Sequence, residues 1–92
     1  MVERQVVVIN RLGLHARAAA RLVRTASAFR SSVRLERADS SASADAKSIL
    51  SVLMLAAARG TNLRASAEGA DEEAALAAVC ELITSGFGEG EQ

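Results

Sequence analysis

The chain has 92 residues, enough for one small domain with a single hydrophobic core and too few for a separate catalytic lobe. Half of its residues are hydrophobic but only 2% are aromatic, so the core must be built from alanine, valine, leucine and isoleucine. Eleven basic and eleven acidic residues cancel, which argues against a strongly basic nucleic-acid-binding protein.

Cysteine content and the N-terminal segment set further limits. Cys80 is the only cysteine, so no internal disulfide bond can form and the ligand spacings of zinc sites are absent. The segment 1–10 carries Glu3 and Arg4 and only a four-residue apolar run, which fits neither a signal peptide nor a spanning helix. We therefore expect a cytoplasmic protein that needs no metal or cofactor and does not insert into membranes.

The first part of the chain predicts a strand, a helix and a second strand. A β-branched run at 6–9 continues an alternation of valines and predicts the first strand. From about His15 into the high twenties, apolar residues recur at helical spacing. The predicted buried stripe of this helix is Ala19, Leu22, Val23, Ala26 and Phe29. Val33 and Leu35 then alternate with polar residues, which predicts a half-buried strand.

The segment 38–46 has two interpretations. It is rich in serine, alanine and aspartate, a composition typical of turns and flexible loops. It can hold a turn at Asp39-Ser40 followed by a third strand through Ala42 and Ala44, or it can remain a loop.

The rest of the chain predicts a helix, a strand and a last helix. Ser48 can cap a helix that stops at Gly60, and its predicted buried stripe is Ile49, Val52, Leu53 and Ala56. Alternating apolar residues at 63–67 predict the fourth strand. Acidic residues at 71–73 suit the first turn of the last helix. The predicted buried stripe of that helix is Leu76, Val79, Cys80 and Ile83.

The predicted order is βαββαβα, an α+β fold. The short connection between the second and third strands requires a hairpin and hence antiparallel pairing, so we expect a sheet with helices on one face. The domain is expected to cover 1–85, and the Gly- and Glu-rich residues 86–92 are expected to form a flexible tail.

His15 is the only histidine, and it lies where the first loop gives way to the helical pattern. Most single histidines are ordinary surface or packing residues. An imidazole can, however, act as a nucleophile near neutral pH, and a helix start offers unpaired N–H groups and partial positive charge to an anion. Together with the nearby Arg17, this position favours a site for a phosphate on His15.

A basic stripe begins beside this histidine. Arg17, Arg21 and Arg24 are four and three residues apart, so they share one face of the first helix. A cation at a helix start costs a few tenths to about 1 kcal/mol, so Arg17 is better explained if an anion binds there. The stripe is either a solvated polar face or a surface for an acidic partner, and its convergence on His15 favours the partner. A nucleic-acid surface is a weaker interpretation because charge is balanced and aromatic residues are few.

Three motifs resemble one known family. The segment 13–19 (Gly-Leu-His-Ala-Arg-Ala-Ala) is similar to the active-site signature of HPr, the histidine phosphocarrier family of the bacterial phosphoenolpyruvate-dependent phosphotransferase system. The segment 46–50 (Ala-Lys-Ser-Ile-Leu) resembles the family's second motif and 67–72 its third, in the family's order. The resemblance implies an open-faced β-sandwich, a four-stranded antiparallel sheet with three helices on one face, which agrees with the predicted element order.

The resemblance also implies a reaction. His15 would accept a phosphoryl group on Nδ1 from enzyme I and pass it to an EIIA-type protein. The side chain of Arg17 and the backbone amides of Ala16 and Arg17 would hold the phosphate. The protein would be a carrier, a substrate of enzymes rather than an enzyme, and we expect it to act as a monomer.

The family's docking patch and regulatory serine have counterparts in this chain. The docking residues implied by the resemblance are Arg21, Arg24, Ile49, Leu50 and Leu53. Ile49 and Leu53 also belong to the predicted buried stripe, and we expect core packing for both, so Leu50 is the better surface residue. Ser48, besides its capping role, corresponds to a serine that an HPr kinase/phosphatase modifies in some bacteria. A phosphate there would add about −1.5 to −2 charges beside the apolar patch.

Two alternatives remain open. Ala18 in place of a common proline, the run 51–57 and the Phe87-Gly88-Glu89 tail resemble the NPr-like nitrogen-regulatory branch more than the sugar-uptake branch. A competing hypothesis is a regulatory binding module of the same fold, acting through the arginine stripe without phosphoryl turnover. The intact His15 and Arg17 argue against that hypothesis.

Overall fold

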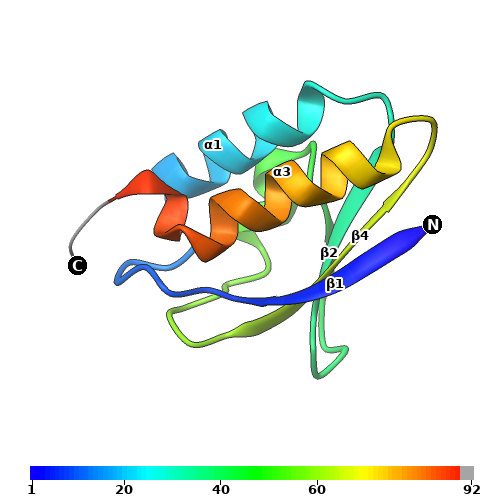
Figure 1. Cartoon of the computed structure of the whole chain (residues 1–92). Helices are drawn as coiled ribbons and strands as arrows, with labels where there is room; N and C mark the ends of the chain where they lie inside the picture. The colour runs from blue at the N-terminus through cyan, green and yellow to red at the C-terminus, as the bar shows by residue number, and fades with distance from the viewer. Residues whose placement is uncertain (90–92) are drawn as a thin grey trace.

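A computed structural model of the chain describes residues 1–89, which form a sheet covered on one side by helices (Figure 1). The elements in chain order are β1 (Val2–Val7), α1 (Ala16–Ser27), β2 (Ser32–Arg37), β3 (Ser43–Asp45), α2 (Ile49–Leu53), β4 (Asn62–Glu68), α3 (Glu72–Thr84) and a short 3-10 helix, η1 (Gly86–Gly88). The predicted order βαββαβα is confirmed.

The sheet is antiparallel throughout its described strands. Its order is β1-β4-β2-β3, so β4 is hydrogen-bonded on both sides and β1 and β3 form the edges. Helices α1 and α3 run side by side across one face, and α3 ends beside the start of α1 (Figure 1). The start of α1 and the end of the described chain therefore meet at one end of the molecule.

The segment 38–46 forms a hairpin, so the strand interpretation is correct and the loop interpretation is wrong. Ser40 adopts a φ of 62°, and the Asp39 carboxylate accepts hydrogen bonds from the backbone N–H and hydroxyl of Ser41 at 3.0 and 2.6 Å. These local bonds close the turn. The third strand is short, but it places Ala44 in the core opposite Leu35.

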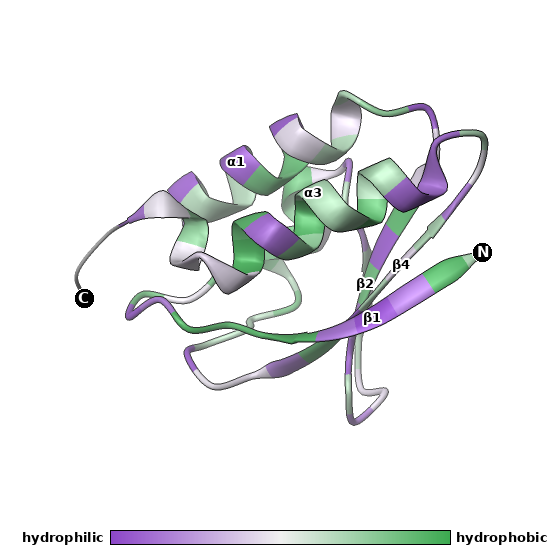
Figure 2. Ribbon diagram, in the orientation of Figure 1, coloured by the Kyte–Doolittle hydropathy of each residue, from purple (hydrophilic) through white to green (hydrophobic). Residues whose placement is uncertain are grey.

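The core lies between the sheet and the helices. The inward alternation of β2 and β4 and the predicted buried stripe of α3 are confirmed, and in α1 the residues Ala19, Leu22 and Ala26 are buried. Val23 and Phe29 are only partly buried. Figure 2 shows the apolar sides of α1 and α3 turned toward the sheet and the polar sides turned outward. Small alanines allow the helices to approach the sheet closely, which suits a core with few aromatic side chains.

The predicted second helix is much shorter than expected. It ends at Leu53 rather than near Gly60, and of its five residues only Val52 is buried. The chain continues as an irregular segment that buries Leu55 and Ala57 while Ala56 is exposed. Arg37 donates to the carbonyl oxygens of Leu55 and Ala56 at 3.0 and 3.4 Å, which satisfies the end of this segment without further helix.

The expected flexible tail at 86–92 is wrong for residues 86–89. Gly86–Gly88 form η1, and Phe87 is fully buried in the core. Burial of an aromatic side chain outweighs the local flexibility of the two flanking glycines. Residues 90–92 lie outside the described residues, so the tail prediction is untested there.

Asp71 joins the loop before β2 to the start of α3. Its carboxylate accepts hydrogen bonds from the Ser31 hydroxyl at 2.6 Å and from the backbone N–H groups of Ser31 and Arg30 at 2.9 and 3.0 Å. The Ser31 hydroxyl, followed by the Arg30 N–H, lowers the pKa of Asp71 from 3.8 to about 2, although desolvation opposes the shift. The charged carboxylate is therefore favoured in the folded state.

We expect the Asp71 carboxylate to make the free energy of unfolding depend on pH in the acidic range. Because the folded pKa of Asp71 is below the unfolded one, its contribution is complete above about pH 4 and is lost as pH falls toward about 2. Asp71→Asn should flatten the fall in the urea unfolding midpoint across that range. The exposed Glu73→Gln serves as the control for loss of one charge. An Asp71→Asn variant whose acid dependence matches that of wild type would contradict the assignment.

Candidate functional site

The loop before α1 is fixed by the segment that follows α2. The Leu14 N–H donates to the Ala57 carbonyl oxygen at 2.9 Å, and the Gly13 N–H donates to that of Asn10 at 3.1 Å. Gly13 has a φ of 64°, and a Cβ added there would lie 2.5 Å from the Ala57 oxygen. Only glycine fits this position. The tight passage delivers the chain to the first turn of α1 with His15 at the cap.

His15 is the N-cap residue of α1. Its backbone is extended, with φ −74° and ψ 177°, and its carbonyl oxygen accepts the Ala19 N–H at 2.8 Å. The imidazole Nδ1 accepts a hydrogen bond from the backbone N–H of Arg17 at 3.2 Å. Because a backbone N–H can only donate, a neutral ring in this geometry carries its proton on Nε2 and a lone pair on Nδ1. The side chain is 27% exposed, so the ring is reachable from solvent.

The other ring nitrogen, Nε2, is paired with a carboxylate. Oε2 of Glu89 pairs with Nε2 of His15, and Oε1 of Glu89 accepts from Asn10 Nδ2 at 3.1 Å. Asn10 is itself buried, and the same Nδ2 donates to the Gly13 carbonyl oxygen at 2.8 Å. Burial raises the pKa of Glu89, but hydrogen bonds from His15 and Asn10 and the charges of His15 and Arg21 outweigh it and lower the pKa overall. Glu89 is thus held charged against the imidazole.

Helix η1 places this carboxylate. Phe87 anchors the segment in the core, its carbonyl oxygen accepts a hydrogen bond from an Arg21 Nη1, and the Glu89 N–H donates to the Gly86 oxygen at 3.1 Å. The sequence interpretation missed both Asn10 and Glu89. The available signal was Phe87, because a chain with two aromatic residues does not usually leave one in a free tail.

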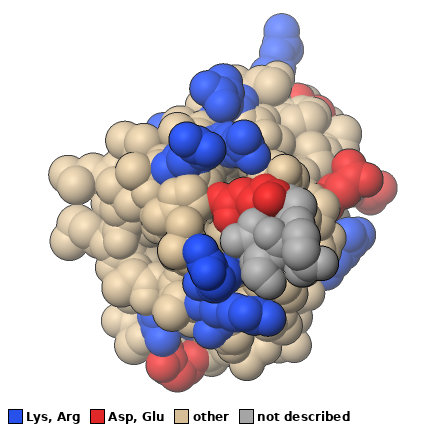
Figure 3. Space-filling model, turned by 90° about the vertical axis from the view of Figure 1, so that its left-hand side faces the viewer, with Lys and Arg blue, Asp and Glu red and all other residues tan. Residues whose placement is uncertain are grey.

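The arginine stripe is divided by the structure. Arg17 and Arg21 line a shallow surface hollow together with His15, Leu12, Gly88 and Glu89, whereas Arg24 lies exposed on α1 outside it. In the view onto this end of the molecule, basic side chains lie on several sides of an acidic patch (Figure 3). Arg21 is partly buried and donates to the Phe87 carbonyl oxygen, so Arg17 is the more exposed cation beside His15.

The predicted helix-capping role of Ser48 is confirmed, because its hydroxyl accepts from the Ser51 N–H at 3.3 Å. Leu50 is 67% exposed, as the surface interpretation expected. The expected core packing of Ile49 is wrong: this side chain, on the first residue of α2, is 43% exposed. Leu53 is partly buried and packs against the core. Met54 adds a further exposed apolar group next to α2.

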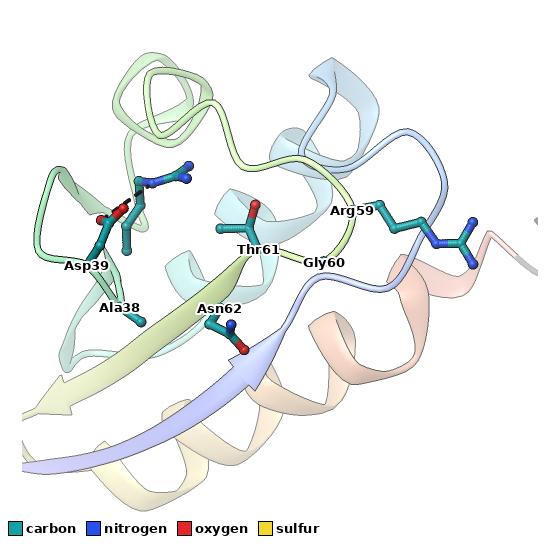
Figure 4. Close-up of a pocket in the computed structure, with 7 residues that line it drawn as sticks. Ala38, Asp39, Arg59, Gly60, Thr61 and Asn62 are labelled. Atoms are coloured by element: carbon teal, nitrogen blue, oxygen red, sulfur yellow. Dashed lines mark ion pairs between the residues drawn. The ribbon is translucent and has the colours of Figure 1, made fainter.

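A second hollow lies away from His15, between the turn after β2 and the start of β4 (Figure 4). Asp39 and Arg37 form an ion pair of 3.8 Å there, and Arg37 also donates to the Leu55 carbonyl oxygen. Arg59 points away from this pair (Figure 4). The charged groups are thus engaged in holding loops and do not converge on a common point.

Within residues 1–89, no cluster of three His, Cys, Asp or Glu side chains could hold a metal ion. None of its helices is long and apolar enough to cross a membrane.

An open-faced α+β sandwich with a histidine at the start of its first helix is the architecture of the histidine phosphocarriers. Residues 2–85 match the family described as "PTS HPr component phosphorylation site". The chain therefore belongs to the HPr family of phosphocarriers of the phosphotransferase system, as its motifs indicated.

Individual relatives are similar in sequence to this chain over nearly its whole length. A phosphocarrier protein HPr of Pseudomonas aeruginosa is 49% identical over 87 residues, which are 95% of this chain and 96% of the relative. A phosphocarrier protein NPr of Shewanella violacea is 41% identical over 88 residues, 96% and 94% of the two chains. The crystal structure of an HPr from Thermoanaerobacter tengcongensis has a TM-score of 0.91 and 42% identity, covering 99% of this chain and 100% of that chain.

Proposed function

We propose that the protein accepts a phosphoryl group on Nδ1 of His15 from enzyme I and passes it to an EIIA-type protein. The observation that carries this proposal is the placement of the ring. Nδ1 holds a lone pair, faces the first amides of α1 and belongs to a partly exposed side chain. A nucleophile in that position can be reached by a partner protein and needs no metal or cofactor of its own.

The start of α1 suits the phosphorylated state. When Nδ1 forms a bond to phosphorus, its lone pair can no longer accept the Arg17 N–H. That N–H and the Ala16 N–H can then donate to the phosphoryl oxygens, and the partial positive charge of the helix start stabilises them. The guanidinium of Arg17 is exposed beside the ring and can add a charge-assisted hydrogen bond. Modest stabilisation of this kind allows the group to leave again.

Loading with enzyme I tests this proposal. Incubation of the purified chain with enzyme I and phosphoenolpyruvate should add one phosphoryl group to the intact mass. The product should be labile in acid and stable in base, as a nitrogen–phosphorus bond requires. An unchanged mass, or a modification that survives acid, would overturn the proposal.

We propose that partners dock on the apolar group next to α2 and the arginines of α1. Ile49, Leu50 and Met54 are exposed, so together with Leu12 they supply apolar surface that a monomer leaves uncovered. An interface with a desolvated apolar centre and a charged rim suits transient protein–protein contact. The arginines of the rim complement an acidic partner.

Replacing Leu50 with aspartate should weaken docking without touching His15. We expect KM for enzyme I to rise about tenfold because one apolar contact is lost and a charge enters the interface. Steady-state phosphorylation over a range of carrier concentrations measures this. Ala74→Asp adds the same charge at an exposed position in the first turn of α3, away from the site, and serves as the control. Equal KM values in the two variants would place the docking surface elsewhere.

Ser48 is proposed as a regulatory phosphorylation site for an HPr kinase/phosphatase. Ser48 is partly exposed and directly precedes Ile49. A phosphate there would place charge against the docking surface and hinder the same partners. After incubation with such a kinase and ATP, the mass of wild type should rise by one phosphoryl group and that of Ser48→Ala should not change. Equal phosphorylation of both would place the modification elsewhere.

The branch of the system is decided by the recipient protein. We propose the nitrogen-regulatory branch, since Ala18 and the Phe87-Gly88-Glu89 end resemble NPr-like proteins. The chain loaded with phosphate should then transfer faster to a nitrogen-regulatory EIIA than to a sugar-permease EIIA. The reverse preference would assign it to sugar uptake.

A further inference from the structure

We propose that Glu89 is a positioning residue for phosphoryl transfer: its carboxylate holds the proton of His15 on Nε2 and keeps Nδ1 free to attack phosphorus. This inference rests on the proposed function of His15.

The carboxylate is fixed from behind. Glu89 is only 10% exposed at its side chain, and its second oxygen accepts from Asn10 Nδ2 at 3.1 Å. Asn10 is buried and tied to the loop by its bond to the Gly13 carbonyl oxygen. The same asparagine thus links the glycine that shapes the loop to the carboxylate that contacts the ring. A carboxylate held at a set point can hold the imidazole plane in turn.

The ring is defined at both nitrogens. Arg17 donates its backbone N–H to Nδ1, and the Glu89 carboxylate can only accept at Nε2. Both contacts favour the same tautomer, with the proton on Nε2 and the lone pair on Nδ1. Glu89 contacts the nitrogen that does not react, so Nδ1 stays unprotonated and keeps the lone pair that attacks the donor.

The transfer step balances with this assignment. The Nδ1 lone pair attacks the phosphorus of a phosphohistidine on enzyme I, and the bond from phosphorus to the donor nitrogen breaks with its electron pair left on the donor ring. No proton leaves His15. Positive charge develops over its ring, and the negative Glu89 stabilises that charge. In onward transfer the electron pair returns to Nδ1 and the ring departs neutral with Nε2 still protonated.

The contribution of the Glu89 contact to kcat can be estimated. A hydrogen bond to a charged partner is stronger than one to a neutral partner, but both side chains retain some exposure, which weakens the difference. We expect loss of the Glu89 charge to lower kcat for phosphorylation by enzyme I about tenfold. KM should stay the same, because the Glu89 side chain is only 10% exposed and so offers a docking partner little surface.

The test compares Glu89→Gln with wild type and with Glu81→Gln, a loss of charge at an exposed position of α3. Phosphorylation by enzyme I gives kcat and KM. Proton and nitrogen NMR of unphosphorylated protein, at a pH where the ring is neutral, reports the Nε2 proton and its exchange with water. We expect a slowly exchanging Nε2 proton in wild type and Glu81→Gln, and fast exchange with the lower kcat in Glu89→Gln.

The outcomes separate the two proposals. If wild type accepts no phosphoryl group, the proposed function fails. If wild type is phosphorylated and Glu89→Gln matches it in kcat and proton exchange, only the role of Glu89 is wrong. A faster Glu89→Gln would also overturn it, because the carboxylate would then be obstructing the site. Unchanged thermal unfolding of Glu89→Gln ensures that the kinetic change is not a loss of fold.

Discussion

Asparagine in place of His15 should abolish phosphoryl acceptance and leave the domain folded. The imidazole has two roles in the structure, as the proposed nucleophile and as the N-cap of α1. An asparagine side chain can accept the Arg17 N–H and is among the best N-cap residues, but it has no nitrogen that attacks phosphorus. Intact mass after incubation with enzyme I and phosphoenolpyruvate should therefore show no added phosphoryl group.

Alanine at the same position separates the two roles. His15→Ala should be equally unphosphorylated, and loss of the cap should make it about 1 kcal/mol less stable than His15→Asn in urea unfolding. Phosphorylation of either variant at wild-type yield would move the acceptor to another residue. Equal stabilities of the two variants would show that a capping side chain at position 15 does not stabilise α1.

The fold was predictable because its signals are local and repeated. Strands β2 and β4 show clear alternation at Val33–Leu35 and Leu63–Ala67, and both buried alternations are confirmed. The third strand was left open against a loop, because the Ser-, Ala- and Asp-rich composition of 38–46 fits both. The order of strands in the sheet was not predicted, since alternation shows which face is buried but not which strand pairs with which.

The second helix shows where periodicity is insufficient. An alanine- and leucine-rich run continues past Leu53, so the pattern alone places no end before Gly60. The structure ends the helix early because Arg37, from β2, binds the carbonyl oxygens of Leu55 and Ala56. This contact is tertiary, so the local pattern of apolar residues could not show it.

The site was predictable only in its contiguous part. Gly13, His15 and Arg17 lie within five residues, and their helix-start geometry follows from sequence. Glu89 lies 74 positions from His15, so no local pattern connects them. Its approach depends on Phe87 entering the core, which a glycine-rich composition concealed. The segment 86–89 is therefore part of the site, and its stability bears directly on the proposed chemistry.

Truncation of Phe87 to alanine should destabilise the domain more than removal of any exposed apolar side chain. Phe87 is fully buried, and loss of a buried phenylalanine costs about 3–5 kcal/mol through lost burial and the cavity left behind. For a domain of this size, Tm should fall by more than about 10 °C. Leu50→Ala, at a 67% exposed position, should change stability by no more than about 0.5 kcal/mol.

The same truncation should loosen η1 and Glu89 from the site. Residue 87 adopts a φ of 60° between Gly86 and Gly88, a conformation unfavourable for a side-chain-bearing residue, so burial of the ring must maintain η1. Without it, Arg21 loses its carbonyl acceptor and Glu89 is no longer held against His15. Phe87→Ala should therefore show the fast Nε2 proton exchange of Glu89→Gln together with reduced stability, whereas Glu89→Gln shows the exchange alone. A Phe87→Ala variant with slow exchange at Nε2 would mean that Asn10 by itself suffices to hold the carboxylate in place.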